Sequence, residues 1–231
     1  MSLSKKCKYG ATPSFMISEG FLTSQDITFT TKSQWTDLQL KVEDKELYVP
    51  KSHLAMVSPV FRQMFESDFK EKDRNVLPLP GKTYEDVLTF LKCTHPGNLQ
   101  KITYDIVPKV LPLAHEYQVK WIIDDCVKAM MMEMDTYRFV LHNSRSLAPR
   151  VSVLIPSSPV LPLTKTDLYT NCCNICIMAE RYNLCSLIET FIERFSTLNY
   201  KCYKDLSEFK QISVEVRYKI VCARLASKED P

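Results

Sequence analysis

The chain has 231 residues and a formal net charge of +3, from 30 basic and 27 acidic residues. Hydrophobic residues make up 45% of the sequence and charged residues 25%, which is the balance of an ordinary globular protein with a core. The net charge is too small to indicate a nucleic-acid-binding protein, and no apolar run approaches the ~20 residues that span a bilayer. We therefore expect neither nucleic acid nor a membrane among its partners.

Nine cysteines, an odd number, occur in a chain whose first residues lack the apolar stretch of a secretory signal. We expect reduced thiols in an intracellular protein, cytoplasmic, nuclear or both. Cys172, Cys173 and Cys176 lie close together, but zinc would require a second pair of ligands, and Cys185 supplies one at most. Because Cys172 and Cys176 would share a helix face with Ala179, we interpret them as core residues and predict no metal and no cofactor.

The first predicted elements are a flexible N-terminal arm over residues 1–34 and a β-hairpin over residues 37–49. The arm carries little hydrophobic pattern. In the hairpin, Leu38, Leu40 and Val42 alternate with polar residues, which is the period of a strand with one buried face. The letters E-D-K then form a polar turn before the alternation resumes.

The next stretch, PKSHLAMVSPVFRQMF, places a helix stop beside a helix start. Pro50 or Lys51 suits the first turn of a helix, where a missing N–H costs nothing. Ser58 can cap a second helix whose first position is Pro59. The sequence thus predicts two short helices that meet at a sharp corner, the second ending at about Glu66.

Four further elements precede a proline-rich segment. They are a strand over 76–80, a helix over 84–93, and helices over 104–116 and 119–134. Pro112 should kink the third of these. Residues 135–165 are rich in proline and lack acidic residues from position 136, so we interpret them as a basic linker. A helical region over 166–226 and a polar tail over 227–231 complete the chain.

The helical region repeats an earlier pattern. The segments LAHEYQVKWIIDDCV (113–127) and MAERYNLCSLIETFI (178–192) match at an offset of 65 residues, with Tyr117 aligned to Tyr182 and an alanine three residues before each. Each copy is a helix, a tight turn and a second helix. Two such hairpins predict stacked helical pairs.

No catalytic residues are predicted. Only four glycines occur, which leaves no phosphate-binding or dinucleotide-binding loop. Carboxylates are scattered over predicted polar faces, and no isolated pair lies in an apolar setting. Trp35 and Trp121 are interpreted as packing anchors rather than as residues that stack on a ligand. We therefore expect a protein without enzyme activity.

The order of these elements resembles the BTB/POZ domain. The resemblance rests on the hairpin that opens at Asp37, the string L-A-x-x-S-P-x-F-x-x-M-F from Leu54 and the helices that follow. The resemblance covers residues 35–134. It implies an α+β fold, in which a small β-sheet is flanked by short helices. The region 166–226 resembles a shortened BACK-type extension, so an all-α set of helical hairpins should follow the BTB/POZ fold.

The resemblance also implies binding residues. Cullin-binding members carry an apolar-x-Glu motif after the second short helix, and the matching contact residues here are Met64, Phe65, Phe69, Lys70 and Glu71. In the family, Asp37 and Lys51 would lie near a dimer contact, although Pro50 replaces a histidine common before the basic residue. The alternative is that Phe69 folds back onto the core and that Glu71 is one more solvated charge.

Two functions remain open on these grounds. The first is a homodimeric adaptor of a cullin-RING ubiquitin ligase, which binds the cullin N-terminal domain and recruits an unknown protein substrate. The second is a BTB-mediated dimeric scaffold or transcriptional regulator without a ligase role.

Overall fold

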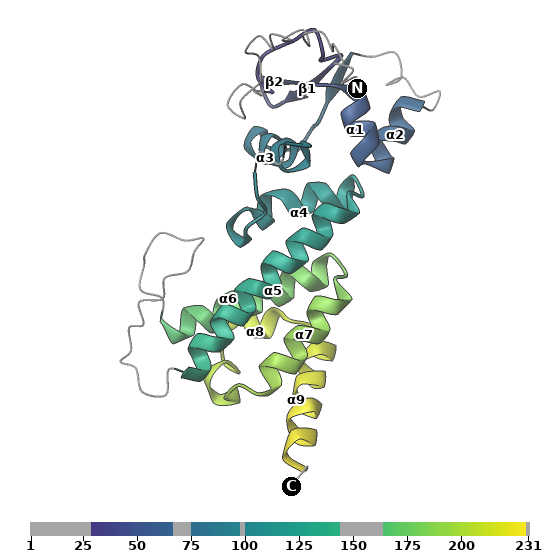
Figure 1. Ribbon diagram of the computed structural model, residues 1–231. Helices are drawn as coiled ribbons and strands as arrows, with labels where there is room; N and C mark the ends of the chain where they lie inside the picture. The colour runs from purple at the N-terminus through teal and green to yellow at the C-terminus, as the bar shows by residue number, and fades with distance from the viewer. Residues whose placement is uncertain (1–28, 67–74, 98–99, 144–163, 230–231) are drawn as a thin grey trace, which may run out of the picture.

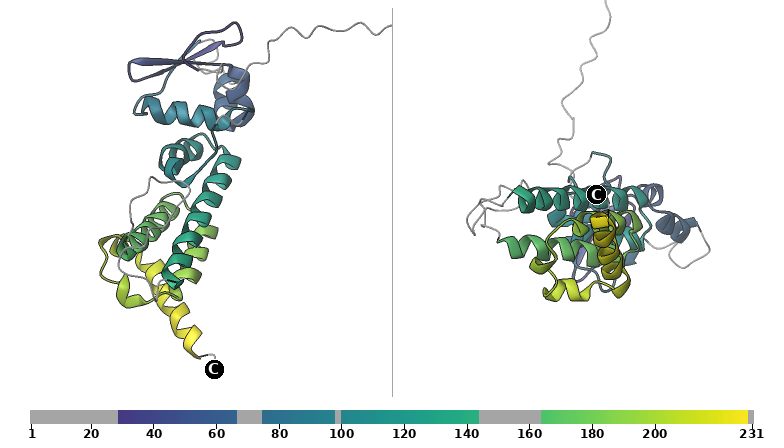
Figure 2. Two further views of the ribbon diagram at one scale, coloured as in Figure 1. Left: turned by 60° about the vertical axis from the view of Figure 1, so that its left-hand side comes forward. Right: turned by 90° about the horizontal axis from the view of Figure 1, so that it is seen from below.

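The computed structural model describes residues 29–66, 75–97, 100–143 and 164–229 (Figure 1). Within them, a small mixed sheet with helices is followed by an all-helical part, which confirms the predicted α+β architecture. The molecule is elongated, with the sheet at one end and the last helix at the other (Figure 2, left). Buried apolar side chains from both parts form one core cluster.

The sheet has three strands in the order β2-β1-β3: β1 is Leu38–Val42, β2 is Lys45–Val49 and β3 is Val76–Pro78. β1 pairs antiparallel with β2 across the predicted turn, where Glu43 has a φ of 53°, and parallel with β3. The three apolar residues of β1 are buried, as their alternation predicts. β3 is shorter than the predicted strand over 76–80.

The folded domain begins before the end of the predicted arm over residues 1–34. Phe29 is buried, and its backbone carbonyl accepts a hydrogen bond from the N–H of Tyr48 at 2.7 Å. The ring of Phe29 also contacts the ring of His95 edge-on, with centroids 6.0 Å apart. Because Phe29 adds a hydrogen bond to β2 and an apolar side chain to the core, it belongs to the domain. Residues 1–28 lie outside the described part of the chain.

The two predicted short helices are present as α1 (Lys51–Val57) and α2 (Pro59–Glu66), and Ser58 forms the corner between them. α3 (Tyr84–Thr94) follows β3. It begins after Thr83, whose hydroxyl accepts a hydrogen bond from a backbone N–H of the first turn at 3.2 Å. Such a cap satisfies one of the donors that a helix start leaves unpaired.

A 3-10 turn, η1 (Tyr104–Ile106), leads into α4 (Val107–Glu116). Pro108 lies in the first turn of α4, where no N–H is needed. Pro112 lies inside α4, and the helix continues through it. The face that α4 buries explains this tolerance, because tertiary packing can outweigh one missing backbone hydrogen bond.

The next helix, α5 (Lys120–Asn143), is longer than predicted. The predictions that it ends near Met134 and that a linker begins at residue 135 are wrong. Tyr137 in the added part is only 2% exposed, and α5 packs on α6. Burial therefore holds these turns in a helix although the basic sequence that follows suggests a linker. Residues 144–163 lie outside the described part of the chain.

In the described residues from 164 onward, the chain forms helices and one 3-10 turn. They are α6 (Lys165–Arg181), α7 (Cys185–Ser196), η3 (Tyr200–Cys202), α8 (Ser207–Gln211) and α9 (Val214–Glu229). α6 begins with a capping box, in which the side chains of Thr164 and Asp167 each accept the backbone N–H of the other, at 3.2 and 2.7 Å. α9 reaches Glu229, so the predicted polar tail begins too early.

The core of the C-terminal part is aromatic. The ring of Phe195 lies 4.3 Å from that of Phe191 and 4.6 Å from that of Tyr203. The hydroxyl of Tyr203 donates to the backbone carbonyl of Phe195 at 3.2 Å, so the only polar atom of this fully buried side chain is satisfied. These contacts fix η3 against the end of α7.

The interpretation of both tryptophans as packing anchors is wrong. Trp35 is 75% exposed and Trp121 is 43% exposed. Trp35 lies two residues after Ser33 in a local turn, and the backbone N–H of Trp35 donates to the hydroxyl of Ser33 at 3.2 Å. Packing in the core of this chain therefore does not account for either tryptophan.

Candidate protein-interaction surface

The corner between α1 and α2 is fixed by one buried hydroxyl. The hydroxyl of Ser58 accepts the N–H of Phe61 at 3.1 Å, which caps α2, and donates to the backbone carbonyl of Tyr117 at 2.7 Å. Ser58 is fully buried. The prediction that it caps α2 is therefore confirmed, and the second bond joins α2 to the corner between α4 and α5.

α2 places a partly accessible apolar face beside this corner. Phe61 is buried and stacks on Tyr117, with centroids 4.3 Å apart and an angle of 23° between the rings. Met64 and Phe65 are half-buried and pack against the core, so each shows only part of its side chain to solvent. Arg62 Nε donates to the carbonyl of Ala55 at 3.0 Å, which further ties α2 to α1.

The predicted contact residues Phe69, Lys70 and Glu71 lie outside the described residues, between Glu66 and Asn75. The structure therefore places only the first two predicted contacts, on α2. The role of Phe69 as a cullin contact therefore stays a prediction.

Asp37 and Lys51, predicted to lie near a dimer contact, contact each other within the chain. A carboxylate oxygen of Asp37 accepts the backbone N–H of Lys51 at 2.6 Å. This bond caps α1 from a distance, because Pro50 at the N-cap has no side chain that can do so. The ammonium group of Lys51 lies 5.9 Å from the ring centroid of Phe65 on α2. The two residues thus join β1, α1 and α2, and a dimer contact stays a prediction.

The repeated helix–turn–helix pattern is confirmed down to the backbone. Gln118 and Asn183 occupy the same position in the two copies, with φ of 55° and 53°. In each copy, the next residue donates its N–H to the carbonyl of a buried alanine, Ala114 at 2.8 Å and Ala179 at 2.9 Å. The absence of a large side chain at each alanine permits this close approach.

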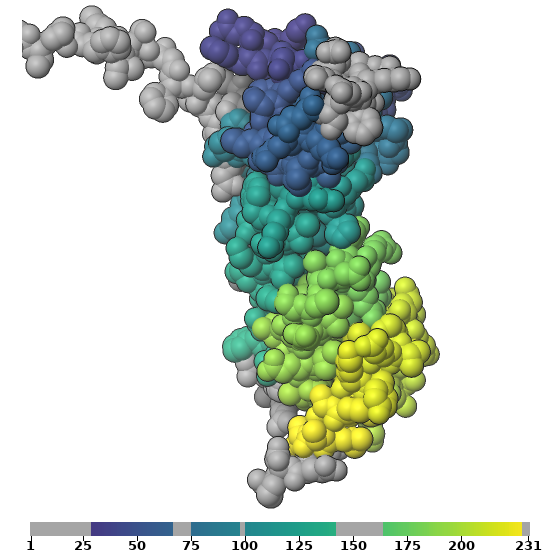
Figure 3. Space-filling view, turned by 90° about the vertical axis from the view of Figure 1, so that its right-hand side faces the viewer, coloured from purple at the N-terminus to yellow at the C-terminus, as the bar shows by residue number. Residues whose placement is uncertain are grey.

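The two repeated corners lie against each other. The ring of His115, in the first copy, lies 5.3 Å from the ring of Tyr182, in the second. Together with the bond from Ser58 to Tyr117, this contact connects α2 to the first corner and the first corner to the second. Figure 3 shows the resulting face, which runs from the blue atoms of α1 and α2 through the teal α4 and α5 to the green α6 and α7.

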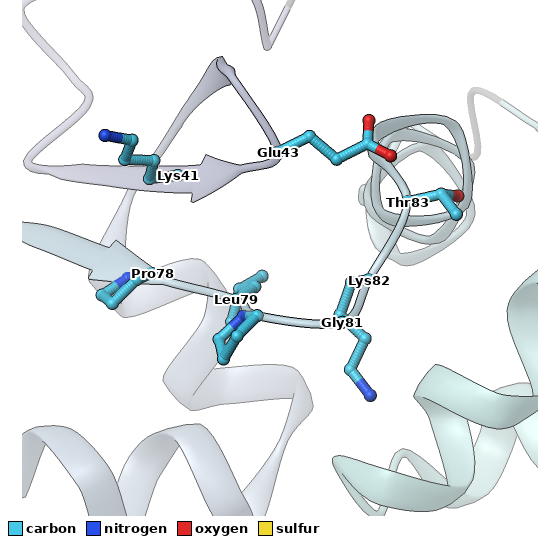
Figure 4. A pocket seen from close by; sticks show the side chains of 8 residues that line it. Lys41, Glu43, Pro78, Leu79, Gly81, Lys82 and Thr83 are labelled. Carbon is cyan, nitrogen blue, oxygen red and sulfur yellow. The ribbon is translucent and has the colours of Figure 1, made fainter.

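A second feature is an open hollow of about 610 Å³ beside the sheet, lined by β1, the segment after β3 and the start of α3. Figure 4 shows that Lys41, Glu43 and Lys82 extend from it in different directions. Lys82 pairs with Glu116, and Glu43 accepts the N–H of Tyr84 at 3.3 Å. Two of its three charged groups are thus bound to the protein itself, and they do not converge on a ligand.

The clustered cysteines are buried in α6. Burial raises the pKa of Cys173 to about 12 and also raises the pKa values of Cys172 and Cys176 above their ordinary range. Thiols of this kind are poor nucleophiles. Among the described residues, no three His, Cys, Asp or Glu side chains come close enough together to hold a metal ion.

Sequence reasoning missed the contacts that join the helices into one face. The bond from Ser58 to Tyr117 spans 59 residues, and nothing local indicates it. The contact between His115 and Tyr182 could have been expected, because these residues follow the two aligned alanines of the repeat and stacked repeats bring matching corners together.

Comparison with known families agrees with this geometry. Residues 28–132 match the BTB/POZ domain, and this part of the chain is a BTB/POZ domain. The BTB/POZ domain is a protein-interaction module. The helices from α6 onward lie beyond the matched residues.

Three curated proteins are similar to this chain over part of its length. BTB and MATH domain-containing protein 38 of Caenorhabditis elegans is 30% identical over 99 residues, which are 43% of this chain and 25% of the relative. BTB/POZ domain-containing protein At1g55760 of Arabidopsis thaliana is 30% identical over 110 residues, 46% of this chain and 32% of the relative. Human Kelch-like protein 28 is 26% identical over 99 residues, 43% of this chain and 17% of the relative. The chain therefore spans less than a third of the length of each.

One further property follows from the described helices. None of them is both long and apolar enough to cross a membrane.

Proposed function

We propose that this protein is the substrate-recruiting subunit of a cullin-RING ubiquitin ligase and that it acts as a dimer. The observation that carries the proposal is the place of the string F-K-E in a BTB/POZ domain: Phe69 follows α2 by only three residues. The N-terminal domain of the cullin would contact Met64 and Phe65 on α2 and then Phe69, Lys70 and Glu71.

The rigid support of α2 favours this role. Ser58 bonds the start of α2 to the corner at Tyr117, and His115 contacts the second corner at Tyr182. A partner that binds α2 can therefore also contact the corners of the helical extension without reordering them. Binding to a preformed surface loses less conformational entropy.

The chemistry of the proposed contact is that of a small hot spot. Met64 and Phe65 are half-buried, so an added partner would complete their burial at a low entropic cost. Phe69 would supply an apolar anchor, and Lys70 and Glu71 a polar rim around it.

The remaining parts of the proposal follow from the same role. Asp37 and Lys51 would lie near the contact between two BTB/POZ domains. The region 166–226, which resembles a BACK-type extension, would lengthen the cullin contact and hold an unknown protein substrate. The protein would act inside the cell, in the cytoplasm, the nucleus or both, and would perform no chemistry of its own.

Calorimetry of the full chain against a cullin N-terminal domain tests this proposal. We expect a Kd of about 1 μM or lower and at least ~10-fold weaker binding by a Phe69→Ala, Glu71→Ala double variant, because such anchors contribute more than ~1 kcal/mol each. A matched control is Phe139→Ala, Asp44→Ala, which removes an exposed phenylalanine and an exposed carboxylate outside both proposed cullin contacts.

The outcomes separate the candidate functions. Binding that the double variant retains would place the cullin contact away from Phe69 and Glu71. The absence of binding by the unmodified chain would overturn the ligase role. If the same sample were dimeric by sedimentation equilibrium, a BTB-mediated scaffold or transcriptional regulator would then be the better account.

A further inference from the structure

The outer face of α9 carries a row of exposed apolar side chains. Val214 is 73% exposed, Tyr218 68%, Val221 39% and Leu225 57%. Their spacing of four, three and four residues keeps them on one side of the helix, in the manner of the apolar positions of a heptad. We call these four residues the α9 row.

The opposite face of α9 packs against the rest of the protein. Val216 and Ile220 are buried, and α9 packs on α7. A helix that is apolar on two opposite faces is usually buried on both. The α9 row therefore lies where a further helix would pack. α9 itself lies at the end of the molecule away from the sheet (Figures 1 and 2). In stacked helical proteins, an outer helix that needs no partner has a polar outer face.

Positive charge follows one side of this row. Arg217 and Arg224 precede Tyr218 and Leu225 by one residue each, and neither forms an ion pair with a carboxylate in the described part of the chain. Arg224 Nη1 donates to the backbone carbonyls of Ser196, at 2.7 Å, and of Leu198, and its guanidinium lies 6.0 Å from the ring centroid of Tyr200. None of these groups carries a full negative charge.

The side chain of Arg217 also has a hydrogen-bond donor without an acceptor. Its Nε is buried and has no hydrogen-bond acceptor among the described residues. On the other side of the row, Lys219 pairs with Glu215 at 2.6 Å, so that side is nearly neutral. The charge beside the α9 row is thus asymmetric and basic.

We propose that the α9 row binds an amphipathic helix of a partner protein, with acidic residues beside its apolar positions. The apolar side chains of that helix would pack between the members of the α9 row. With Tyr218 and Leu225 at a positions, Arg217 and Arg224 stand at g positions, which pair with e positions of a parallel partner helix. Carboxylates there would pair with the positive charge of Arg217 and Arg224.

A second copy of this chain fits the row less well. In a parallel pair of α9 helices, Arg217 would face Cys222 of the other copy, which carries no compensating charge. In an antiparallel pair, Arg217 of one copy would approach Arg224 of the other, which is repulsive. This site does not require cullin binding, so it can be tested separately from the proposed function.

The test uses the full chain and two fluorescent synthetic helices of roughly 21 residues, or three heptads. Both carry leucine at the a and d positions; one carries glutamate and the other lysine at the e and g positions. By fluorescence anisotropy we expect the glutamate peptide to bind at least ~10-fold more tightly than the lysine peptide, since two charge-assisted contacts distinguish them. Added salt should reduce this preference.

Variants locate the site. Tyr218→Glu should weaken binding of the glutamate peptide at least ~10-fold, because it places a like charge in the row. Arg217→Gln should reduce the preference between the peptides. Ala226→Glu introduces the same charge at an exposed position of α9 outside the row and should leave binding within about twofold. Circular dichroism verifies that each variant is folded.

Other outcomes would overturn the proposal. Equal binding of the two peptides, or binding that Tyr218→Glu does not weaken, would exclude an acidic partner helix at the α9 row. A mass by sedimentation equilibrium that falls by half in Tyr218→Glu but not in Ala226→Glu would assign the row to a second copy. Binding to anionic phospholipid vesicles that Tyr218→Glu abolishes, without any peptide preference, would assign it to a membrane surface.

Discussion

The hydroxyl of Ser58 donates a hydrogen bond to the backbone carbonyl of Tyr117 at 2.7 Å, across 59 residues of sequence. The same oxygen accepts the N–H of Phe61. One buried atom therefore caps α2 and fixes it to the corner between α4 and α5. The orientation of the proposed cullin-binding helix depends on this link.

Ser58→Ala should lower the free energy of unfolding by about 1–3 kcal/mol, because it leaves a buried carbonyl and a helix N–H without their partner. Urea unfolding followed by circular dichroism measures this. Ser52→Ala, at an exposed position of α1, is the matched control and should stay within about 0.5 kcal/mol of the unmodified chain. Equal effects of the two substitutions would show that the Ser58 bonds contribute little.

Asp37→Ala should lower the free energy of unfolding by about 0.5–2 kcal/mol, because the backbone N–H of Lys51 would lose its cap. Asp37→Asn retains an acceptor oxygen and should lose less than Asp37→Ala. Sedimentation equilibrium of both variants tests the dimer contact separately. Loss of dimer with unchanged stability would show that Asp37 acts between subunits rather than as a cap.

Gln118→Gly should raise the free energy of unfolding by roughly 0.5–1 kcal/mol, since the left-handed conformation costs about 1–2 kcal/mol for an ordinary residue and the loss of entropy by glycine offsets part of the gain. Asn183→Gly should gain less, because asparagine tolerates positive φ better than glutamine does. Guanidinium unfolding of both variants measures the difference. An equal or larger gain at Asn183 would contradict this account of the two corners.

The stability of the domain should fall in mild acid because of His53. Burial lowers the pKa of His53 below its ordinary value of 6.5, and the neighbouring His95 lowers it further. A depressed folded-state pKa means that the unfolded chain takes up protons more readily. The stabilisation is therefore complete above pH ~6.5 and declines as pH falls through the folded-state pKa.

The unfolding free energies of the unmodified chain and of His53→Gln, at about pH 7.5 and about pH 5.5, measure this contribution. Gln at position 53 cannot become protonated and can still contact Thr94, which lies 3.3 Å from His53 Nε2. The loss of stability between the two pH values should be smaller in the variant. An identical loss would assign acid sensitivity to other groups.

Thiol labelling of the native protein near pH 8 should separate the cysteines into two groups. Cys172, Cys173 and Cys176 are buried with raised pKa values and should resist iodoacetamide. The exposed Cys185 and Cys202 should be modified. Peptide mass spectrometry gives the extent at each residue. Rapid labelling of Cys173 or Cys176 would contradict their role as core packing residues.

The local features of the fold follow directly from the sequence. Three of these features depend on neighbours within a few residues. They are the alternation in β1, the serine and proline that separate α1 from α2, and the helix–turn–helix pattern within each copy of the repeat. Backbone propensities and side-chain periods act over that range, so these predictions are confirmed by the structure. The BTB/POZ domain was recognisable for the same reason, because its string from Leu54 encodes a local corner.

Other features were decided by contacts between distant residues. The α5 helix extends to Asn143 because its last turns pack on α6, although basic residues follow them in sequence. Trp121 is exposed because the core closes without it. The bond from Ser58 to Tyr117 and the approach of His115 to Tyr182 require the complete fold. The sequence by itself determined the elements and their corners, whereas only the tertiary structure decided which corners form one face, because burial depends on what every other element leaves uncovered.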